Sequence, residues 1–203
     1  MKIAILTLNG NYNYGNRLQN YALQFYLKKQ GVESSTVILN APHSMWFTFD
    51  DYNVYDYQLN FRKSIKWIIN WHGFRNHFGK NIPEDIIRQF KIKLFTDNYI
   101  NSLRVNSYQE IIDDFDFFLV GSDQVWSSVN KKLWDKFDLN IFRQKDKIYT
   151  KKCLKEYFLS FAPKDKRISY AASIGTSSLP QKSKKFFKEC FEGMSHISLR
   201  EDS

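Results

Sequence analysis

The sequence predicts an α/β fold in which a parallel sheet carries helices on both faces. Three short, almost unbroken apolar runs support this prediction, at residues 3–8, 115–120 and 168–174. Such runs are typical of parallel strands that are covered on both sides. A stretch with the helical spacing of apolar residues follows the first run, and small or polar residues follow all three. We therefore expect the three strands to be neighbours, with their carboxyl ends at one edge of the sheet.

The first strand is followed by an asparagine-rich loop at residues 9–16 and then by a helix that Gly31 closes. Asn16 is predicted to cap this helix, with Gln19 reaching back as in a capping box. In an open α/β sheet, ligands bind outside the carboxyl ends of the strands, so this loop is a candidate site. Arg17 would place a cation at the positive end of the helix dipole, which favours a nearby anion. A solvated surface arginine is the alternative.

Residues 32–39 form a second predicted strand, and an aromatic-rich helical insertion then occupies about residues 43–105. Within the insertion, residues 57–83 contain five basic residues and no acid, and apolar residues with helical spacing. A basic amphipathic helix can lie on an anionic membrane surface, or it can pack over the sheet with its basic face in solvent. Both interpretations are open. A further helix is predicted to start at Pro83.

A second loop with site chemistry follows the strand at residues 115–120, which a short amphipathic helix ending near Asp114 precedes. Residues 121–126 are Gly-Ser-Asp-Gln-Val-Trp. The glycine suits a turn, the short polar side chains can bind a ligand or cap a helix, and the Trp126 indole can stack on a ligand. Asp123 could pair with Arg17 if the two loops meet. An ordinary helix cap with a core tryptophan is the alternative.

The last part of the chain predicts a third loop of the same kind. Small residues at 171–178 end the third apolar run and would let a ligand approach the backbone. A helix at residues 180–192 and a strand at residues 196–200 come next, with Arg200 at the carboxyl end of that strand. Residues 201–203 would suit the start of another helix. We therefore expect the chain to be an N-terminal portion of a larger fold or a natural truncation.

The composition is that of a globular chain, with 203 residues, 43% of them apolar and 17% aromatic, and a net charge of +9. The charge suits an anionic partner, but a general bias toward lysine explains it without a basic site, and we expect no nucleic-acid partner. Cys153 and Cys190 are predicted to be free thiols. No histidine stands at ligand spacing with them, so we expect no metal site. The chain has neither a signal peptide nor an apolar run of about 18 residues, which predicts a cytoplasmic location.

Four blocks of sequence span nearly the whole chain and together carry a resemblance. They are Asn13-Tyr14-Gly15-Asn16-Arg17-Leu18-Gln19-Asn20-Tyr21-Ala22-Leu23, Val120-Gly121-Ser122-Asp123-Gln124-Val125-Trp126, Ser169-Tyr170-Ala171-Ala172-Ser173-Ile174-Gly175 and Ile197-Ser198-Leu199-Arg200-Glu201. In this combination and order, the blocks resemble the polysaccharide pyruvyl transferase family.

The resemblance implies a two-domain fold of the GT-B type, in which residues 1–203 form a single Rossmann-like N-terminal domain and the C-terminal domain is absent. It also implies transfer of a pyruvyl group from phosphoenolpyruvate to a sugar hydroxyl as a ketal, without a cofactor, during cell-surface or exopolysaccharide synthesis. The acceptor would be a sugar or a lipid-linked glycan. Contact with the inner face of the membrane and homo-oligomerisation are both compatible with this function.

Arg200 matches an arginine of the family's last block, and the resemblance assigns it to phosphoenolpyruvate. A guanidinium fork suits a carboxylate or phosphate better than an ammonium does. The residues expected to bind substrate are Asn13, Gly15, Asn16, Arg17, Gly121, Ser122, Asp123, Gln124, Trp126, Ser173, Gly175 and Arg200.

No general acid is identified among the residues of this chain. His196 lies four positions before Arg200, which is about 13 Å along a strand and too far to share one small donor. We therefore expect the isolated chain to be inactive. Two other classes of function remain open, a GT-B glycosyltransferase with a nucleotide-sugar donor and a non-catalytic module that binds glycans or anions.

Overall fold

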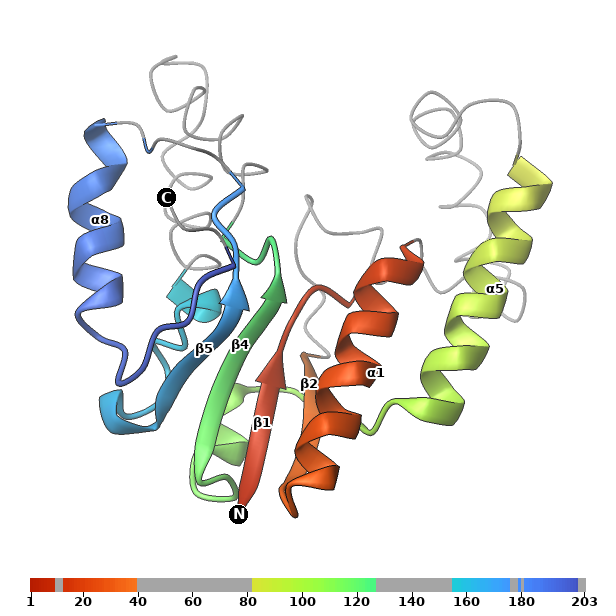
Figure 1. Cartoon of the computed structure of the whole chain (residues 1–203), viewed down its shortest axis with the longest axis horizontal. Helices are drawn as coiled ribbons and strands as arrows, with labels where there is room; N and C mark the ends of the chain where they lie inside the picture. Colours follow the sequence, from red (N-terminus) through yellow and green to blue (C-terminus); the bar gives the residue numbers. More distant parts are fainter. Residues whose placement is uncertain (10–12, 40–81, 127–154, 176–178, 180, 201–203) are drawn as a thin grey trace. The chain divides into compact units, whose positions relative to one another are not determined.

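The computed structural model describes residues 1–9, 13–39, 82–126, 155–175, 179 and 181–200. These residues contain a five-stranded sheet with the order β3-β2-β1-β4-β5, in which every neighbouring pair is parallel. Its strands are β1 (Lys2–Leu6), β2 (Glu33–Leu39), β3 (Ser102–Val105), β4 (Phe117–Asp123) and β5 (Arg167–Ala172). Figure 1 shows β2, β1, β4 and β5 as arrows that point the same way. The α/β prediction is confirmed, as is the expectation that β1, β4 and β5 are neighbours.

The chain forms two compact units, and each is described by itself. The first unit contains residues 1–8, 19–41 and 101–203, and thus the whole sheet. The second contains residues 9–18 and 42–100. Helix α1 (Tyr14–Lys29) begins in the second unit and continues in the first.

The two faces of the sheet bury alternate residues of the same strands. Ile3, Ile5 and Leu119 pack with Leu23 of α1, whereas Ala4, Leu6, Phe118 and Val120 pack with Phe187 of helix α8 (Gln181–Phe191). This alternation follows from the two-residue period of a strand. Both faces of the sheet therefore carry a helix, and the buried parts of β1 and β4, residues 3–6 and 117–120, are apolar because both of their faces are covered.

Helix α1 starts earlier than predicted. Its first residue is Tyr14, and the Asn13 side chain caps it by accepting a hydrogen bond from the Gly15 amide at 2.8 Å. Asn16 is therefore not the cap but lies inside the first turn, because Asn13 already supplies the required oxygen. The predicted end is confirmed. The amides of Gly31 (φ 74°) and Val32 donate to the Lys28 and Leu27 carbonyls at 3.0 Å, the pattern of a Schellman motif.

Two short elements differ from the sequence-based expectation. Strand β3 has no counterpart among the predicted strands, because four residues with one buried side chain give no readable periodicity. The predicted helix ending near Asp114 is a 3-10 turn, η1 (Tyr108–Ile111), which Ser107 caps by accepting from the Gln109 amide at 3.2 Å.

The carboxyl ends of β4 and β5 also differ from expectation. Strand β4 continues through Asp123, so residues 121–123 belong to the strand and not to a loop. The predicted last strand at residues 196–200 is reduced to two parallel bridges, Ile168 with His196 and Ala172 with Leu199. The two bridges are four residues apart along β5, from Ile168 to Ala172, but only three residues apart along the last segment, from His196 to Leu199. The extra residue disrupts the ladder as a bulge does, and Ala171, with a φ of 47°, lies within it.

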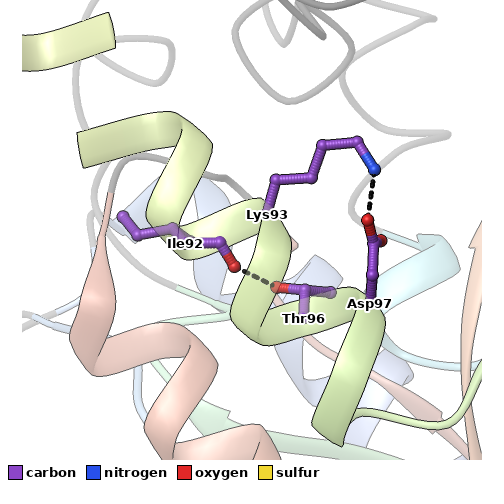
Figure 2. A network of polar contacts seen from close by, with 4 residues as sticks. All are labelled: Ile92, Lys93, Thr96 and Asp97. Carbon is purple, nitrogen blue, oxygen red and sulfur yellow. Dashed lines mark hydrogen bonds and ion pairs between the residues drawn. The ribbon is translucent and has the colours of Figure 1, made fainter. Parts of the chain in front are cut away.

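Helix α5 (Ile82–Tyr99) belongs to the second unit and confirms the predicted helix that starts near Pro83. Its C-terminal half buries Ile92, and the Thr96 hydroxyl donates to the Ile92 carbonyl at 2.9 Å (Figure 2). On the outer side, Lys93 and Asp97 form an ion pair at 2.5 Å one turn apart. The basic segment predicted at residues 57–83 lies outside the described residues except for its end. No helix in the described ranges is long and apolar enough to cross a membrane.

Candidate functional site

Three segments that are distant in the sequence meet at the carboxyl end of β5, within the first unit. Asp123 of β4 pairs with Ala172 of β5, and Ala172 is bridged to Leu199 on its other side. The Arg200 amide donates to the Ala172 carbonyl at 3.2 Å. The backbones of Asp123 and Arg200 therefore flank the same residue, as expected for strand ends at one edge of a parallel sheet. This convergence is the candidate site.

Ser173 follows Ala172 and shapes the turn at the centre of this edge. It is fully buried, and its carbonyl accepts a hydrogen bond from the Trp126 amide at 3.1 Å. Its hydroxyl oxygen accepts from the Gly175 amide at 3.0 Å, and Gly175 has a φ of 67°. Ser173 thus ties the segment after β4 to the turn after β5. Among the neighbouring candidates, Ser122 is half-buried and Gln124 is exposed.

The close approach of β4 and β5 requires a glycine. Gly121 has a φ of +121°, and a Cβ added to it would lie 2.2 Å from the Tyr170 carbonyl oxygen. That position is the partner of Tyr170 in the β4–β5 ladder. No side chain fits there, so the role of Gly121 that the structure supports is backbone packing beside the candidate site.

Trp126 is part of the core. It is 1% exposed, stacks on Phe158 with a ring separation of 4.8 Å, and meets Phe191 edge-on at 5.2 Å. Its indole N–H donates to the Tyr157 carbonyl at 2.9 Å. These contacts favour the core interpretation over a stacking platform for a ligand.

The predicted residues of the first loop, Asn13, Gly15, Asn16 and Arg17, lie in the second unit. Arg17 is 1% exposed, so the alternative of a solvated surface arginine is wrong. Both terminal nitrogens of its guanidinium donate to Asn9 Oδ1 at 3.3 Å. A buried guanidinium that an amide oxygen orients is suited to bind an anion. The Asp123 side chain lies outside the described set, so its pairing with Arg17 stays a prediction.

A buried amide network between α1, β2 and Asn101 has no counterpart among the predicted residues. Gln24 Nε2 donates to Thr36 Oγ1 and to the Asn101 carbonyl, and Gln24 Oε1 accepts from the Asn101 amide, each at 2.9 Å. Thr36 in turn donates to Asn20 Oδ1 at 2.9 Å. The signal in the sequence was the spacing of Asn16, Asn20 and Gln24, which places three amides on one side of α1. All three are buried.

His196 and Arg200 pair with opposite ends of β5. His196 is bridged to Ile168 near the start of the strand, and Arg200 is held at Ala172, its last residue. This arrangement agrees with the expectation that His196 does not share a small ligand with Arg200. Among the described residues, no group of three histidine, cysteine or acidic side chains could hold a metal ion.

Cys190 is a structural thiol in α8. Burial raises its pKa from 9.0 to about 11. The raised value keeps the sulfur protonated at neutral pH, and a thiolate is the reactive form. We expect Cys190 in a Cys153→Ser variant to react with iodoacetamide at pH 8 much more slowly in the folded protein than after denaturation in urea. Equal rates before and after denaturation would contradict the assignment.

Comparison with known proteins gives one match. A sequence model of the polysaccharide pyruvyl transferase family matches residues 13–203. No curated protein and no solved structure gives a significant match. The matched range contains all four sequence blocks described above, and three of them meet around Ala172 in the structure. Because the family match covers almost the whole chain and includes the segments that build this edge of the sheet, the protein belongs to the polysaccharide pyruvyl transferase family.

Proposed function

We propose that the protein takes part in the transfer of a pyruvyl group from phosphoenolpyruvate to a saccharide during polysaccharide synthesis. The observation that carries the proposal is the family match, which includes the segment with Arg200. The convergence of Asp123, Ser173 and Arg200 at one edge of the sheet supports it, since ligands of open α/β folds bind at this edge.

The reaction joins two sugar hydroxyl oxygens to C2 of the enolpyruvyl group and breaks the bond between C2 and the phosphate oxygen. Two protons leave the hydroxyls. One protonates C3, which becomes a methyl group, and the other leaves with inorganic phosphate. The products are a cyclic ketal and phosphate, so atoms and charge balance without a redox cofactor. The step requires a positioned acid for C3 and cationic groups for the departing phosphate.

Within the first unit, Arg200 is the residue proposed to bind phosphoenolpyruvate, the donor of the pyruvyl group. Its side chain is exposed, and its amide is fixed to Ala172, so the guanidinium starts from a defined point of the site. A planar fork of N–H donors matches both the carboxylate and the phosphate of phosphoenolpyruvate. Ser173 contributes by holding the turn beside it.

The test is an NMR titration of the full chain with phosphoenolpyruvate at moderate salt. We expect an affinity of order millimolar, about 4 kcal/mol. Arg200→Ala should weaken binding about tenfold, and shifted amides should cluster at residues 122–124 and 173–175. The matched control is Arg104→Ala. Arg104 is also exposed, but it lies in β3, which is the outermost strand on the side of the sheet away from β5. The Arg104→Ala variant should therefore bind phosphoenolpyruvate as the wild type does.

Two results would overturn the proposal. Equal weakening by Arg200→Ala and Arg104→Ala would assign binding to overall charge and not to a site. Shifts at the same residues with uridine diphosphate sugars, but not with phosphoenolpyruvate, would instead support a glycosyltransferase. Phosphate release from phosphoenolpyruvate that depends on an added saccharide would support the transfer step directly.

A further inference from the structure

Tyr170 is unusual within the sheet because its large aromatic side chain is exposed. It lies in β5 between buried Ser169 and half-buried Ala171, yet 47% of its surface meets solvent. Its partner in β4 is Gly121. Glycine has no side chain, so the residue paired with Tyr170 places none against its ring.

Tyr170 also differs from the other aromatic residues around the site. Trp126, Phe158, Phe187 and Phe191 contact one another ring to ring in the core. In the described part of the chain, Tyr170 makes no such ring contact, and its hydroxyl has no hydrogen-bond partner. An exposed aromatic ring without an internal role is more informative than an exposed aliphatic side chain, because burying it would stabilise the fold.

The position of Tyr170 links it to the candidate site. It stands two residues before Ala172, which is at most about 7 Å along an extended strand. Ala172 is the residue that joins Asp123 on one side and Arg200 on the other. Leu199, bridged to Ala172, is 42% exposed. An aromatic face, an apolar side chain and a guanidinium thus start from adjacent positions at one edge of the sheet.

We propose that Tyr170 is the platform on which a ring of the acceptor saccharide stacks, next to the donor position at Arg200. A pyranose ring has one face of C–H groups and a rim of hydroxyls. The C–H groups carry partial positive charge and suit the negative face of an aromatic ring, while the rim hydroxyls remain free to reach the donor. The phenol oxygen of Tyr170 can hydrogen-bond the same rim. The inference rests on the proposed function for its choice of ligand, but it concerns a different residue and a different substrate.

The test is saturation-transfer NMR of the full chain with methyl glycosides of hexoses and of N-acetylhexosamines. We expect the sugar C–H protons to receive saturation and the Tyr170 ring signals to shift. Tyr170→Ile keeps a residue suited to a strand but removes the aromatic face, and should weaken saccharide binding about tenfold. Tyr170→Phe should retain most of the binding. The matched control is Tyr26→Ala, because Tyr26 is 56% exposed on α1 and should not contribute.

The outcomes separate this inference from the proposed function. Saccharide binding that is unchanged in Tyr170→Ile, or lost equally in Tyr26→Ala, would overturn the platform even if phosphoenolpyruvate binds at Arg200. Binding that requires Tyr170 would support the platform even if phosphoenolpyruvate fails to bind. The phosphoenolpyruvate affinity of Tyr170→Ile should equal that of the wild type, and a parallel loss of both ligands would count against a specific role for the ring.

Discussion

Replacing Gly121 with alanine is expected to lower the free energy of unfolding by about 4 kcal/mol. Two costs add at this position. The backbone has a φ of +121°, where a residue with a Cβ is strained, and the new Cβ would lie 2.2 Å from the Tyr170 carbonyl oxygen. A backbone oxygen cannot rotate away, so β4 and β5 would have to separate. Because a domain has only about 5 to 15 kcal/mol of stability, urea denaturation should show a much lower midpoint, or an unfolded protein.

Gly31→Ala is the control for this prediction. Gly31 also has a positive φ, +74°, but a Cβ there would have no atom within 4 Å. It therefore carries only the conformational cost, about 1 kcal/mol. The difference between the two variants isolates the contact with Tyr170. Equal losses of stability would mean that the strands separate easily at Gly121, and the tight β4–β5 approach beside the site would then be refuted.

The apolar runs predicted the architecture because burial on both faces leaves a plain mark on a sequence. β1 and β4 are apolar at successive positions over most of their length, and a parallel arrangement brings the carboxyl ends of the strands to one edge. Local capping was harder to predict. Asn13 and Asn16 are the same residue type in the same loop, and only the observed contact with the Gly15 amide decides which of them caps α1. The irregular pairing of the last segment coincides with a positive φ at one residue, Ala171, which the sequence does not signal.

The convergence of Asp123, Ser173 and Arg200 was predictable from topology, since Asp123 ends β4, Ser173 follows β5, and Arg200 ends a segment that was expected to run parallel to them. The burial or exposure of individual side chains was not predictable in this way. Trp126 follows a loop motif in the sequence, and its burial depends on Phe158 and Phe191, which come from distant parts of the chain. Tyr170 looks like an ordinary strand residue in the sequence, and its 47% exposure is known only from the folded structure. Spacing in one segment cannot report the partner that another segment supplies.

The second large effect is expected at the buried amide network. Gln24→Leu should cost about 2 to 3 kcal/mol, because the backbone amide of Asn101 loses its acceptor and the Thr36 hydroxyl and Asn101 carbonyl each lose a donor. Thr36 keeps its bond to Asn20, so the loss is limited. The control is Gln109→Leu. Gln109 is exposed, and its substitution should change the stability by less than about 0.5 kcal/mol.

Gln24→Glu distinguishes hydrogen bonding from shape, because the side chains have the same size. The carboxylate keeps an acceptor for the Asn101 amide but places a second acceptor where Nε2 donated to the Asn101 carbonyl. At neutral pH this variant should be less stable than Gln24→Leu, since it also buries a charge. Protonation restores a donor, and burial raises the pKa of such a carboxyl, so the deficit relative to wild type should shrink as the pH falls below neutrality. Urea denaturation of both proteins across pH 5 to 8 measures this difference. A deficit that is constant over that range would show that the amide group of Gln24 does not donate within the network, and that α1 is held to β2 and Asn101 by packing alone.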